Sequence, residues 1–318
     1  MNERTRQKLR DLRPFLAAGL TILLWASSYP GIRAGLHSYS PTHLALLRYT
    51  TAALTLGVYA LVTHMRLPRW RDLGAITLLG LVGIAFYGVA LNTGEITVQS
   101  AVASFLVNMA PIFVALEARI WLGERLRSLG WLGILISFSG VAVIAWSGAS
   151  GLTIDARALI IVVAAFAFSI YVVGQKRLLK RSTAVQFSTF AVGASAIALL
   201  IFLPGLPEEV QAAPLGDTLA VIYLGVFPAA LGYITWAYAL AHIPASKTAS
   251  FLYLQPLLVL GIAWVWLGEL PSLLALAGGV LVLAGVIVVN TRGRAPRSSE
   301  AAPLNADHPA GEQEAQRK

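Results

Sequence analysis

Two hydrophobic segments, residues 98–122 and 246–267, carry small and hydrogen-bonding side chains at helical spacing. Residues three or four apart share one face of a helix, so each set forms a stripe. Such a stripe either lets helices pack closely or lines a wet cavity that can hydrogen-bond a ligand. The residues concerned are Ala101, Ser104, Asn108 and Pro111 in the first segment and Ser246, Ser250 and Tyr253 in the second, where Gln255 lies near the proline.

Pro111 and Pro256 lie inside these two segments. A proline within a helix cannot donate to the carbonyl four residues earlier, and its ring clashes with the preceding turn. The freed carbonyls could bind a substrate ammonium group, and the kink could act as a hinge. A static kink is the structural alternative. Because the two prolines occupy matching positions, we predict that they act in gating.

Four tyrosines, Tyr87, Tyr171, Tyr233 and Tyr253, fall near the middle of hydrophobic segments. Tyrosines at the ends of such segments commonly mark a membrane interface, but these lie too deep for that role. Convergent rings with hydroxyl groups suit an amphipathic or aromatic ligand, and tight helix packing is the alternative. The predicted substrate-binding residues are Tyr87, Ser104, Asn108, Tyr171, Tyr233, Ser250, Tyr253 and Gln255.

Ionisable residues within the hydrophobic segments are few, the clearest being Arg48, Glu117 and Arg119. A charge inside a membrane is commonly functional. These three lie toward the ends of their segments, where long side chains reach water, so structural roles are predicted for them. Glu117 is the candidate for a proton carrier. Glu124 and Glu269 end two segments, where each could cap the N-terminus of the next helix.

The chain lacks the residue patterns of metal proteins and of common enzymes. It has no cysteine, which excludes disulfides, thiolate ligands and thiol nucleophiles. Its five histidines are scattered, so a zinc site is not expected. The sequence contains no G-x-S-x-G, H-E-x-x-H or phosphate-binding P-loop motif. We therefore predict a protein that is not an enzyme and that needs neither a metal nor a cofactor.

The composition predicts an all-α, polytopic membrane protein. Of the 318 residues, 57% are hydrophobic and 12% are charged, and the mean hydropathy is +0.71. Soluble domains have about 25% charged residues. Ten apolar runs, each near the length of one bilayer crossing, lie at 15–36, 43–63, 73–92, 98–122, 129–147, 158–175, 184–203, 217–241, 246–267 and 273–290.

Lysine and arginine are concentrated in alternate loops, which predicts the orientation of the chain. They gather before residue 14, at 66–71, at 125–127 and at 176–181, whereas the intervening loops are poor in positive charge. By the positive-inside rule, both termini face the cytoplasm of a multi-pass protein in the inner (plasma) membrane. The same bias accounts for the net charge of +9. We expect contact with anionic lipid and no binding of nucleic acid.

The chain contains an internal repeat. The tetrapeptide W-L-G-E occurs at 121–124 and at 266–269, and in both copies a proline precedes the glutamate by thirteen residues. Five spans per copy is an odd number, so the second copy must be inverted in the membrane, as in many transporters. The predicted regions are a cytoplasmic tail at 1–14, five-helix repeats at 15–148 and 155–291, and a disordered cytoplasmic tail at 292–318.

The repeat extends to the spans on either side of this motif. Gly133 and Gly140 in the fifth predicted span match Gly278 and Gly285 in the tenth. The stretch 25–33 in the first span parallels 168–176 in the sixth more weakly. Two inverted copies also give a route to alternating access, because exchanging their conformations opens a central cavity to the other side of the membrane.

With these features, the chain resembles the EamA-type branch of the drug/metabolite transporter superfamily over residues 15–291. Within it, the sequence is most similar to bacterial aromatic amino-acid exporters of the YddG type. The resemblance implies ten transmembrane helices around a central cavity, lined mainly by the first, third, fourth, sixth, eighth and ninth. It also implies export of amino acids or related small metabolites.

Three alternatives stay open at the level of the sequence. Within transport, the substrate could be a drug or another metabolite such as a sugar derivative. From other classes, the protein could be a passive channel or a membrane-embedded enzyme. Partners other than a small-molecule substrate and lipid are not indicated, and a monomer is compatible with everything above.

Overall fold

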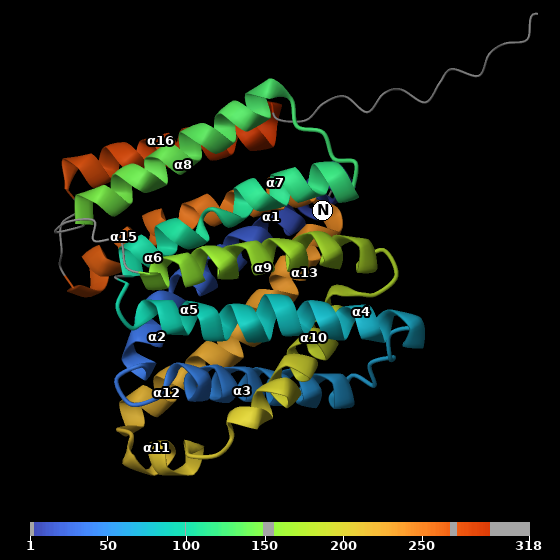
Figure 1. The fold of residues 1–318 in the computed structure, drawn as a ribbon. Helices are drawn as coiled ribbons and strands as arrows, with labels where there is room; N and C mark the ends of the chain where they lie inside the picture. The colour runs from blue at the N-terminus through green and yellow to red at the C-terminus, as the bar shows by residue number, and fades with distance from the viewer. Residues whose placement is uncertain (1–2, 99, 149–155, 268–271, 293–318) are drawn as a thin grey trace, which may run out of the picture.

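The structure of the chain is a computed structural model, which describes residues 3–98, 100–148, 156–267 and 272–292 (Figure 1). The side chains of some residues within these ranges, Ser104 among them, also fall outside the described part. All regular elements of the described residues are helical, which confirms the prediction of an all-α protein. Its α-helices begin with α1 (Glu3–Ala26), α2 (Ser28–Gly35), α3 (Pro41–Val62), α4 (Trp70–Gly80), α5 (Tyr87–Glu95), α6 (Ser100–Val107), α7 (Ala110–Trp121) and α8 (Ser128–Gly148).

The second half of the chain is also helical. It contains α9 (Ala156–Leu178), α10 (Ala184–Leu199), α11 (Leu206–Ala212), α12 (Leu215–Leu224), α13 (Gly232–His242), α14 (Ala245–Ser250), α15 (Gln255–Leu267) and α16 (Leu273–Arg292). Four further segments have π or 3₁₀ geometry: η1 (Leu81–Phe86), η2 (Leu200–Phe202), η3 (Gly225–Leu231) and η4 (Phe251–Leu254).

Six helical stretches of the described residues are long and apolar enough to cross a membrane. They are Asp11–Gly35, Pro41–Val62, Trp70–Glu95, Arg157–Leu178, Ala184–Phe202 and Leu215–His242. Their outward-facing side chains include large apolar groups such as Leu61, Leu159 and Ile197, which are more than half exposed. A surface of this kind suits contact with lipid chains. The short helix α11 was not predicted from the sequence.

Local sequence signals explain where several helices begin. Pro41 occupies the first turn of α3, where its missing N–H costs nothing, and the Ser40 hydroxyl accepts from the His43 amide at 3.3 Å. Thr183 and Gln186 form a reciprocal capping box at the start of α10. These caps fix the ends of α3 and α10, which pack against each other.

Helices α8 and α16 form an antiparallel pair at one edge of the molecule (Figure 1). Their backbones approach closely at four glycines. A Cβ placed on Gly133 would lie 2.8 Å from the Gly285 carbonyl oxygen, and one on Gly140 would lie 2.6 Å from that of Gly278. Small residues permit such backbone contact between helices in lipid. The pair is closed by Val141, Val282 and Val289, which are fully buried.

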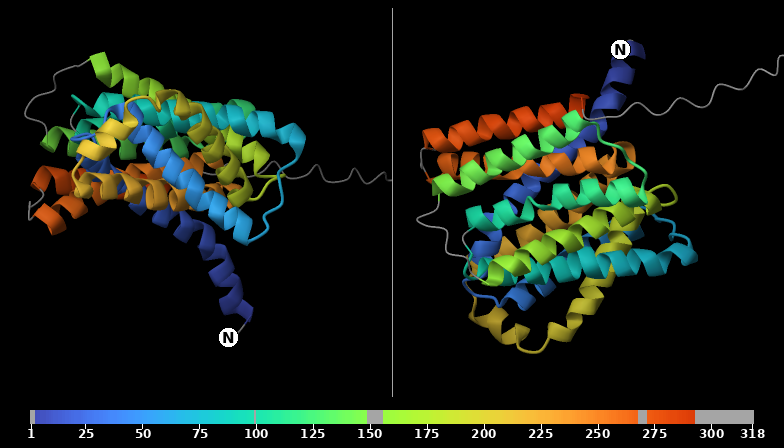
Figure 2. Two further views of the ribbon diagram at one scale, coloured as in Figure 1. Left: turned by 90° about the horizontal axis from the view of Figure 1, so that it is seen from below. Right: turned by 45° about the horizontal axis from the view of Figure 1, so that its top comes forward.

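Helix α9 lies against α4, η1, α5, α6 and α7, all of which it contacts (Figure 1). Helix α1 crosses beside α13, and its N-terminal part extends beyond the other helices (Figure 2). Four of the largest buried side chains of the described residues, Tyr49, Tyr171, Tyr233 and Trp236, lie in this region. The main core of the protein is therefore built around aromatic rings.

Irregular helical geometry recurs at matching places in the two halves. The stretch 70–95 contains the π segment η1, and the stretch 215–242 contains the π segment η3. Likewise, the segment with Pro111 is interrupted at residues 108–109, and the segment with Pro256 is interrupted by the 3₁₀ turn η4. Interruptions of this kind are frequent at functional sites.

Candidate functional site

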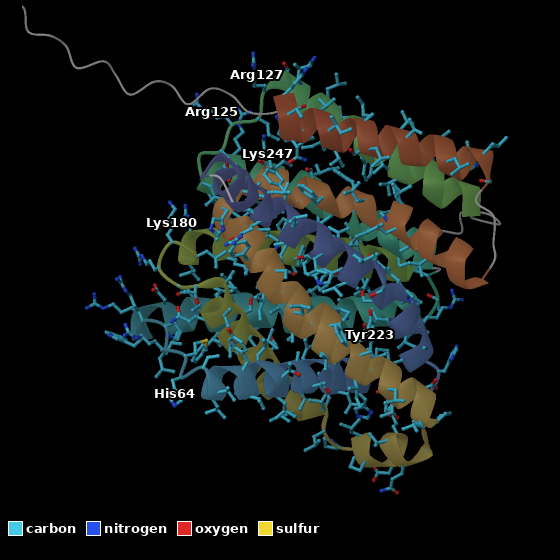
Figure 3. All side chains as sticks on the ribbon, turned by 180° about the vertical axis from the view of Figure 1, so that it is seen from behind. His64, Arg125, Arg127, Lys180, Tyr223 and Lys247 are labelled. Atoms are coloured by element: carbon cyan, nitrogen blue, oxygen red, sulfur yellow. The ribbon has the colours of Figure 1, made fainter. Side chains whose placement is uncertain are left out.

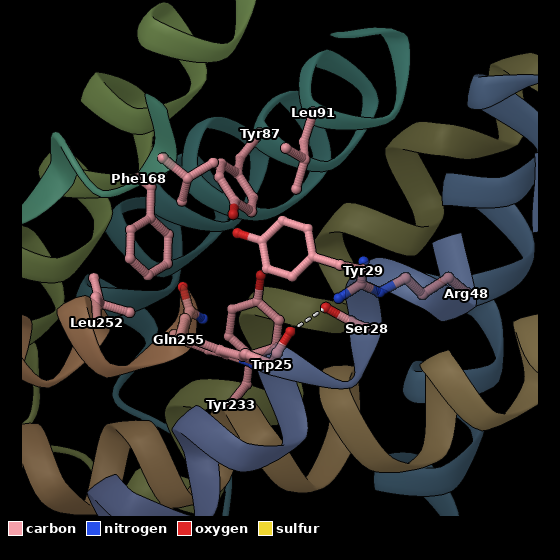
Figure 4. Close-up of a pocket in the computed structure, with 11 residues that line it drawn as sticks. Trp25, Ser28, Tyr29, Arg48, Tyr87, Leu91, Phe168, Tyr233, Leu252 and Gln255 are labelled. Carbon is pink, nitrogen blue, oxygen red and sulfur yellow. Dashed lines mark hydrogen bonds between the residues drawn. The ribbon is translucent and has the colours of Figure 1, made fainter. Parts of the chain in front are cut away.

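A pocket lies where these irregular helices meet (Figure 4). Its cavity volume is ≈ 20 Å³, which is roughly the room for one water molecule. An amino acid or a larger ligand would fit only after the side chains move apart. The pocket is lined by Trp25, Ser28, Tyr29, Arg48, Tyr87, Leu91, Val107, Phe168, Tyr233, Leu252 and Gln255.

Trp25 is the centre of the aromatic wall. Its ring centroid lies 5.7 Å from that of Phe168 and 5.6 Å from that of Tyr233, both in edge-to-face geometry, and 5.1 Å from that of Trp236. Its indole N–H donates to the carbonyl of Pro228 in η3 at 3.0 Å. Trp25 therefore joins α1, α9 and α13 around one apolar surface.

Three tyrosine hydroxyls converge on the middle of the pocket. Figure 4 shows Tyr29, Tyr87 and Tyr233 pointing toward one another from α2, α5 and α13. The Gln255 side chain enters from the start of α15, and its Oε1 is buried with no hydrogen-bond partner among the described residues. The centre of the pocket thus presents neutral donors and acceptors inside an aromatic shell.

One end of the pocket carries charge. Arg48 on α3 is only 5% exposed, and its Nε atom has no hydrogen-bond partner among the described residues. Glu95, at the end of α5, lies one helical turn beyond the pocket residue Leu91 and interacts electrostatically with Arg48 and Arg33. Its Oε1 is likewise buried and without a described partner.

Pro111 and Pro256 each leave the backbone carbonyl of a pocket-lining residue without its usual helical hydrogen bond. Pro111 cannot donate to the carbonyl of Val107, and Pro256 cannot donate to that of Leu252, since these lie four positions earlier. In the second case the Gln255 amide takes over the Leu252 carbonyl in a 3₁₀ turn. The interruptions therefore fall at matching positions on the wall of the same pocket.

Of the predicted binding residues, Tyr87, Tyr233 and Gln255 line this pocket. Tyr171 stands directly behind it: its ring packs edge-to-face on Tyr233 with centroids 6.0 Å apart, and its hydroxyl accepts from Gln175 at 3.2 Å. Tyr171 can therefore hold the pocket wall without reaching a ligand.

The other predicted binding residues lie elsewhere. The hydroxyl of Ser250 donates to the Lys247 carbonyl at 2.8 Å and accepts from Asn290 of α16 at 3.0 Å. Tyr253 is buried in the cluster formed by α7, α8 and α16. Asn108 is buried at the interruption between α6 and α7, beside the pocket residue Val107. Ser104 lies in α6, and its side chain is outside the described part.

Several pocket residues were not among those predicted. Trp25 and Phe168 are the first residues of the two stretches that the repeat aligns, and their rings touch, so the repeat contained a signal for this pair. Arg48 was assigned a structural role near a membrane surface, whereas it lines the pocket. Sequence position gives the depth of a residue in its span, but not the direction in which its side chain points.

Glu124 caps a helix, as predicted, but the helix differs from the predicted one. Its carboxylate accepts from the amides of Ala245 and Ser246 at 2.8 and 3.1 Å, at the start of α14 and not at the helix that follows in sequence. Nearby, the Lys176 ammonium donates to the carbonyls of Leu240 and Ile243. These contacts join α7, α9, α13 and α14 at one end of the molecule. Glu269 lies outside the described residues.

Glu117 is buried away from the pocket. One of its carboxylate oxygens accepts from the Ser169 hydroxyl of α9 at 2.7 Å, and the other has no hydrogen-bond partner among the described residues. The described residues also contain no cluster of His, Cys, Asp and Glu able to hold a metal ion.

Comparison with known proteins shows matches that extend over almost the whole helical region. A family model described as "EamA-like transporter family" matches residues 13–146 and again 156–291. The chain is 45% identical over 278 residues to the "Uncharacterized transporter YdfC" of Bacillus subtilis (strain 168), covering 87% of this chain and 90% of that one. It is 38% identical over 284 residues to a "Probable terminal-alkyne amino-acid exporter" of Streptantibioticus cattleyicolor, covering 89% and 95%.

The fold also has a counterpart among solved structures. One crystal structure superimposes with a TM-score of 0.71 at 20% sequence identity, covering 86% of this chain and 95% of that chain. At this identity the similarity concerns the fold alone. It shows that the arrangement of helices described above occurs in an experimentally determined protein.

Proposed function

Because the chain belongs to the EamA-like transporter family, we propose that it is a carrier that exports amino acids with apolar or aromatic side chains. Its relatives are transporters, so the protein is a multi-pass membrane transporter and not an enzyme. The substrate class and the direction of transport form the proposal. Placement in the inner (plasma) membrane agrees with a relative at 28% identity, the "Uncharacterized inner membrane transporter YedA" of Escherichia coli (strain K12).

The observation that carries the proposal is the composition of the pocket. Aromatic rings around Trp25 offer an apolar surface for a side chain, and the tyrosine hydroxyls, Gln255 and Arg48 offer polar contacts for the remainder of the molecule. A zwitterion with an apolar side chain has both requirements. The relative at 38% identity is named a "Probable terminal-alkyne amino-acid exporter", and a terminal alkyne is an apolar group.

An inverted repeat of five and five spans is the architecture that we propose for the carrier. The family model matches two consecutive stretches of similar length, 13–146 and 156–291, close to the proposed units at 15–148 and 155–291. The glycine contacts support inversion. In the repeat, Gly133 corresponds to Gly278 and Gly140 to Gly285. A two-fold rotation that exchanges the two units therefore turns the contact between Gly133 and Gly285 into a contact between Gly278 and Gly140. Both contacts occur in the structure.

Alternating access would then proceed by exchange of conformations between the two units. The interruptions before Pro111 and Pro256 flank the pocket from both units, which supports their proposed role as hinges. The small size of the cavity is compatible with a carrier between loading events, since a substrate would have to separate the units to enter.

We propose that both termini and the basic loops face the cytoplasm. In Figure 3, Arg125, Arg127, Lys180, Lys247 and His64 lie toward one end of the helices and Tyr223 lies toward the other. Labelling is straightforward because the chain has no cysteine. A cysteine introduced at position 208 should react with an impermeant reagent from outside the cell, and one at position 69 should not. The opposite pattern would reverse the orientation.

The function itself is tested by transport in proteoliposomes that contain the purified protein. We expect saturable counterflow of labelled L-phenylalanine or L-leucine, with competition by apolar amino acids and little by sugars, lysine or organic cations. Preferential competition by sugars or hydrophobic cations would identify efflux of another metabolite or of drugs. Flux without saturation or counterflow would indicate a channel.

In cells, expression should raise resistance to the toxic analogue p-fluorophenylalanine and lower its accumulated content. Increased accumulation and greater sensitivity would indicate uptake, and would contradict the proposed direction.

A further inference from the structure

The charged end of the pocket is built by residues on two different helices. Arg48, from α3, lines the cavity, and Glu95 follows the lining residue Leu91 on α5 by one turn. Each has a buried polar atom without a hydrogen-bond partner among the described residues: Nε of Arg48 and Oε1 of Glu95. Burying such atoms unpaired is costly, which suggests that something else completes them.

The two groups are not joined in an ion pair. The ion pairs formed by the described residues within 4.0 Å are those of His43 with Glu209 and of Arg181 with Asp72. Arg48 and Glu95 nevertheless interact electrostatically, and the Arg48 guanidinium also lies 5.3 Å from the centroid of the Tyr49 ring. The Arg48 guanidinium and the Glu95 carboxyl group are therefore held near each other without a direct ion pair.

From this arrangement, and on the basis of the proposed function, we propose that Arg48 and Glu95 form the binding site for the zwitterionic group of the amino acid. The guanidinium of Arg48 binds the α-carboxylate, and the carboxylate of Glu95 binds the α-ammonium. The rings around Trp25 and Phe168 take the side chain. The charged end therefore requires an amino acid, and the aromatic end selects among amino acids.

The chemistry of the residues fits these roles. A guanidinium presents several N–H groups in a planar fork that matches a carboxylate, and its charge persists at every physiological pH. Hydrogen bonds between ionised partners are stronger than neutral ones, particularly where water is excluded. The three central tyrosine hydroxyls can bridge the two ends of the ligand, since they can both donate and accept.

The competing explanation is structural: Arg48 and Glu95 could serve only to balance each other's charge. The two explanations differ in the double variant. If the pair is only structural, replacing both charges with Arg48→Gln and Glu95→Gln leaves no unpaired charge and should restore what each single change loses. If the pair binds the substrate, the double variant stays defective.

The experiment measures counterflow of labelled L-phenylalanine per folded protein in proteoliposomes. We expect Arg48→Gln to lose at least tenfold in transport, equivalent to about 1.4 kcal/mol, and Arg48→Lys to lose less because it keeps the charge. The double variant should be no better than Arg48→Gln. Recovery of wild-type transport by the double variant would overturn the proposal, as would unchanged transport by Arg48→Gln. The matched control is Arg119→Gln, an exposed arginine of α7.

The roles of Arg48 and Glu95 can be tested separately with competitors that each lack one charged group of the amino acid. L-Phenylalanine amide has no carboxylate, and 3-phenylpropionate has no ammonium group. Against the wild-type protein, both should compete at least tenfold more weakly than L-phenylalanine. In the Glu95→Gln variant, 3-phenylpropionate should gain relative to L-phenylalanine, because the carboxylate that repels it is gone. Competition by the amide equal to that of L-phenylalanine would contradict the role of Arg48.

A binding measurement separates this proposal from the proposed function. Titration of the detergent-solubilised protein with 3-phenylpropionate can be followed by tryptophan fluorescence, since Trp25 lines the pocket. Binding that is lost in Arg48→Gln and kept in Arg119→Gln would support the carboxylate site even if no amino acid were transported. Equal binding of 3-phenylpropionate to the wild-type protein, Arg48→Gln and Arg119→Gln would overturn the proposed carboxylate site, whatever the transport assays show.

Discussion

The aromatic pocket and the α8–α16 pair are built in different ways, although both consist of apolar helices. Helices α8 and α16 are uninterrupted, and their glycines bring the backbones together. Ser137, a fully buried polar side chain of α8, donates to the Val282 carbonyl of α16. The pocket lies among helices broken by π and 3₁₀ segments. Around it, the polar atoms of Arg48, Glu95 and Gln255 are buried without described partners.

This difference shows which features mark a site in a protein of uniform hydrophobicity. Apolar composition and burial are common to both regions and carry no functional signal. Irregular helical hydrogen bonding and incompletely satisfied polar groups occur together in the pocket region, where a ligand could use them. The regular pair can therefore be expected to determine stability, and the irregular region to determine transport.

The largest effect should come from overfilling the regular pair. Gly140→Leu would place its Cβ 2.6 Å from the Gly278 carbonyl oxygen and 2.7 Å from the Val282 amide nitrogen, so the helices must separate. We expect a loss of about 1–3 kcal/mol or more in stability, seen as a lower unfolding temperature in detergent. Gly57→Leu on α3 is the control, because nothing lies within 4 Å of its Cβ. Equal unfolding temperatures for the two variants would contradict close packing at Gly140.

Trp25→Ala should have the next largest effect, in the other region. It removes the hydrogen bond to Pro228 and three ring contacts on the pocket wall. Transport per folded protein should fall at least tenfold, which corresponds to ~1.4 kcal/mol. The matched change Trp131→Ala, on α8, should lower stability but leave transport per folded protein close to wild type. Equal transport losses in the two variants would erase the distinction between the regions.

Removing the helix interruptions should have a several-fold effect. The double variant Pro111→Ala/Pro256→Ala restores two backbone N–H donors and favours continuous helices on both sides of the pocket. If the interruptions act as hinges, transport falls several-fold while the amount of folded protein in the membrane stays near that of the wild type. Unchanged transport would show that the interruptions are only structural.

Tyr87→Phe should have the smallest effect of the series. It removes one hydroxyl from the centre of the pocket and keeps the ring, so the loss should be about 1 kcal/mol or less, roughly fivefold or less in transport. Tyr87→Ala should lose more, because it also removes the ring. Tyr59→Phe, at a half-exposed tyrosine on the outside of α3, is the control. A greater loss for Phe than for Ala would contradict a contribution from the ring.

Much of this fold could be predicted from the sequence because membrane helices follow from long apolar runs and from the internal repeat. The glycines matched between the fifth and tenth predicted spans do meet in the structure. Tyr87, Tyr233 and Gln255, predicted as binding residues, do line one pocket. Both observations concern residues that were singled out by their spacing along the chain, and the binding role of the three lining residues stays a prediction.

The other site residues could not be predicted, because their contacts depend on the direction in which each side chain points. Ser250 and Tyr253 belong to the stripe of the second segment, yet Ser250 contacts Asn290 of α16 and Tyr253 is buried in the cluster formed by α7, α8 and α16. Arg48 was predicted to lie near a membrane surface, because its position in the sequence gives its depth in the span but not the direction of its side chain. Helix α11 was missed because it is a short polar helix within a connection.

Photo-labelling of the reconstituted protein with L-photo-leucine, an apolar amino acid whose side chain carries a diazirine, can locate the amino-acid site. Peptides labelled in the presence and absence of excess L-leucine can be identified by mass spectrometry. The account predicts that the label which L-leucine suppresses lies on the pocket-lining parts of α1, α5, α9, α13 and α15. Suppressible label confined to α8 and α16, or label that L-leucine does not suppress, would contradict an amino-acid site in the aromatic pocket.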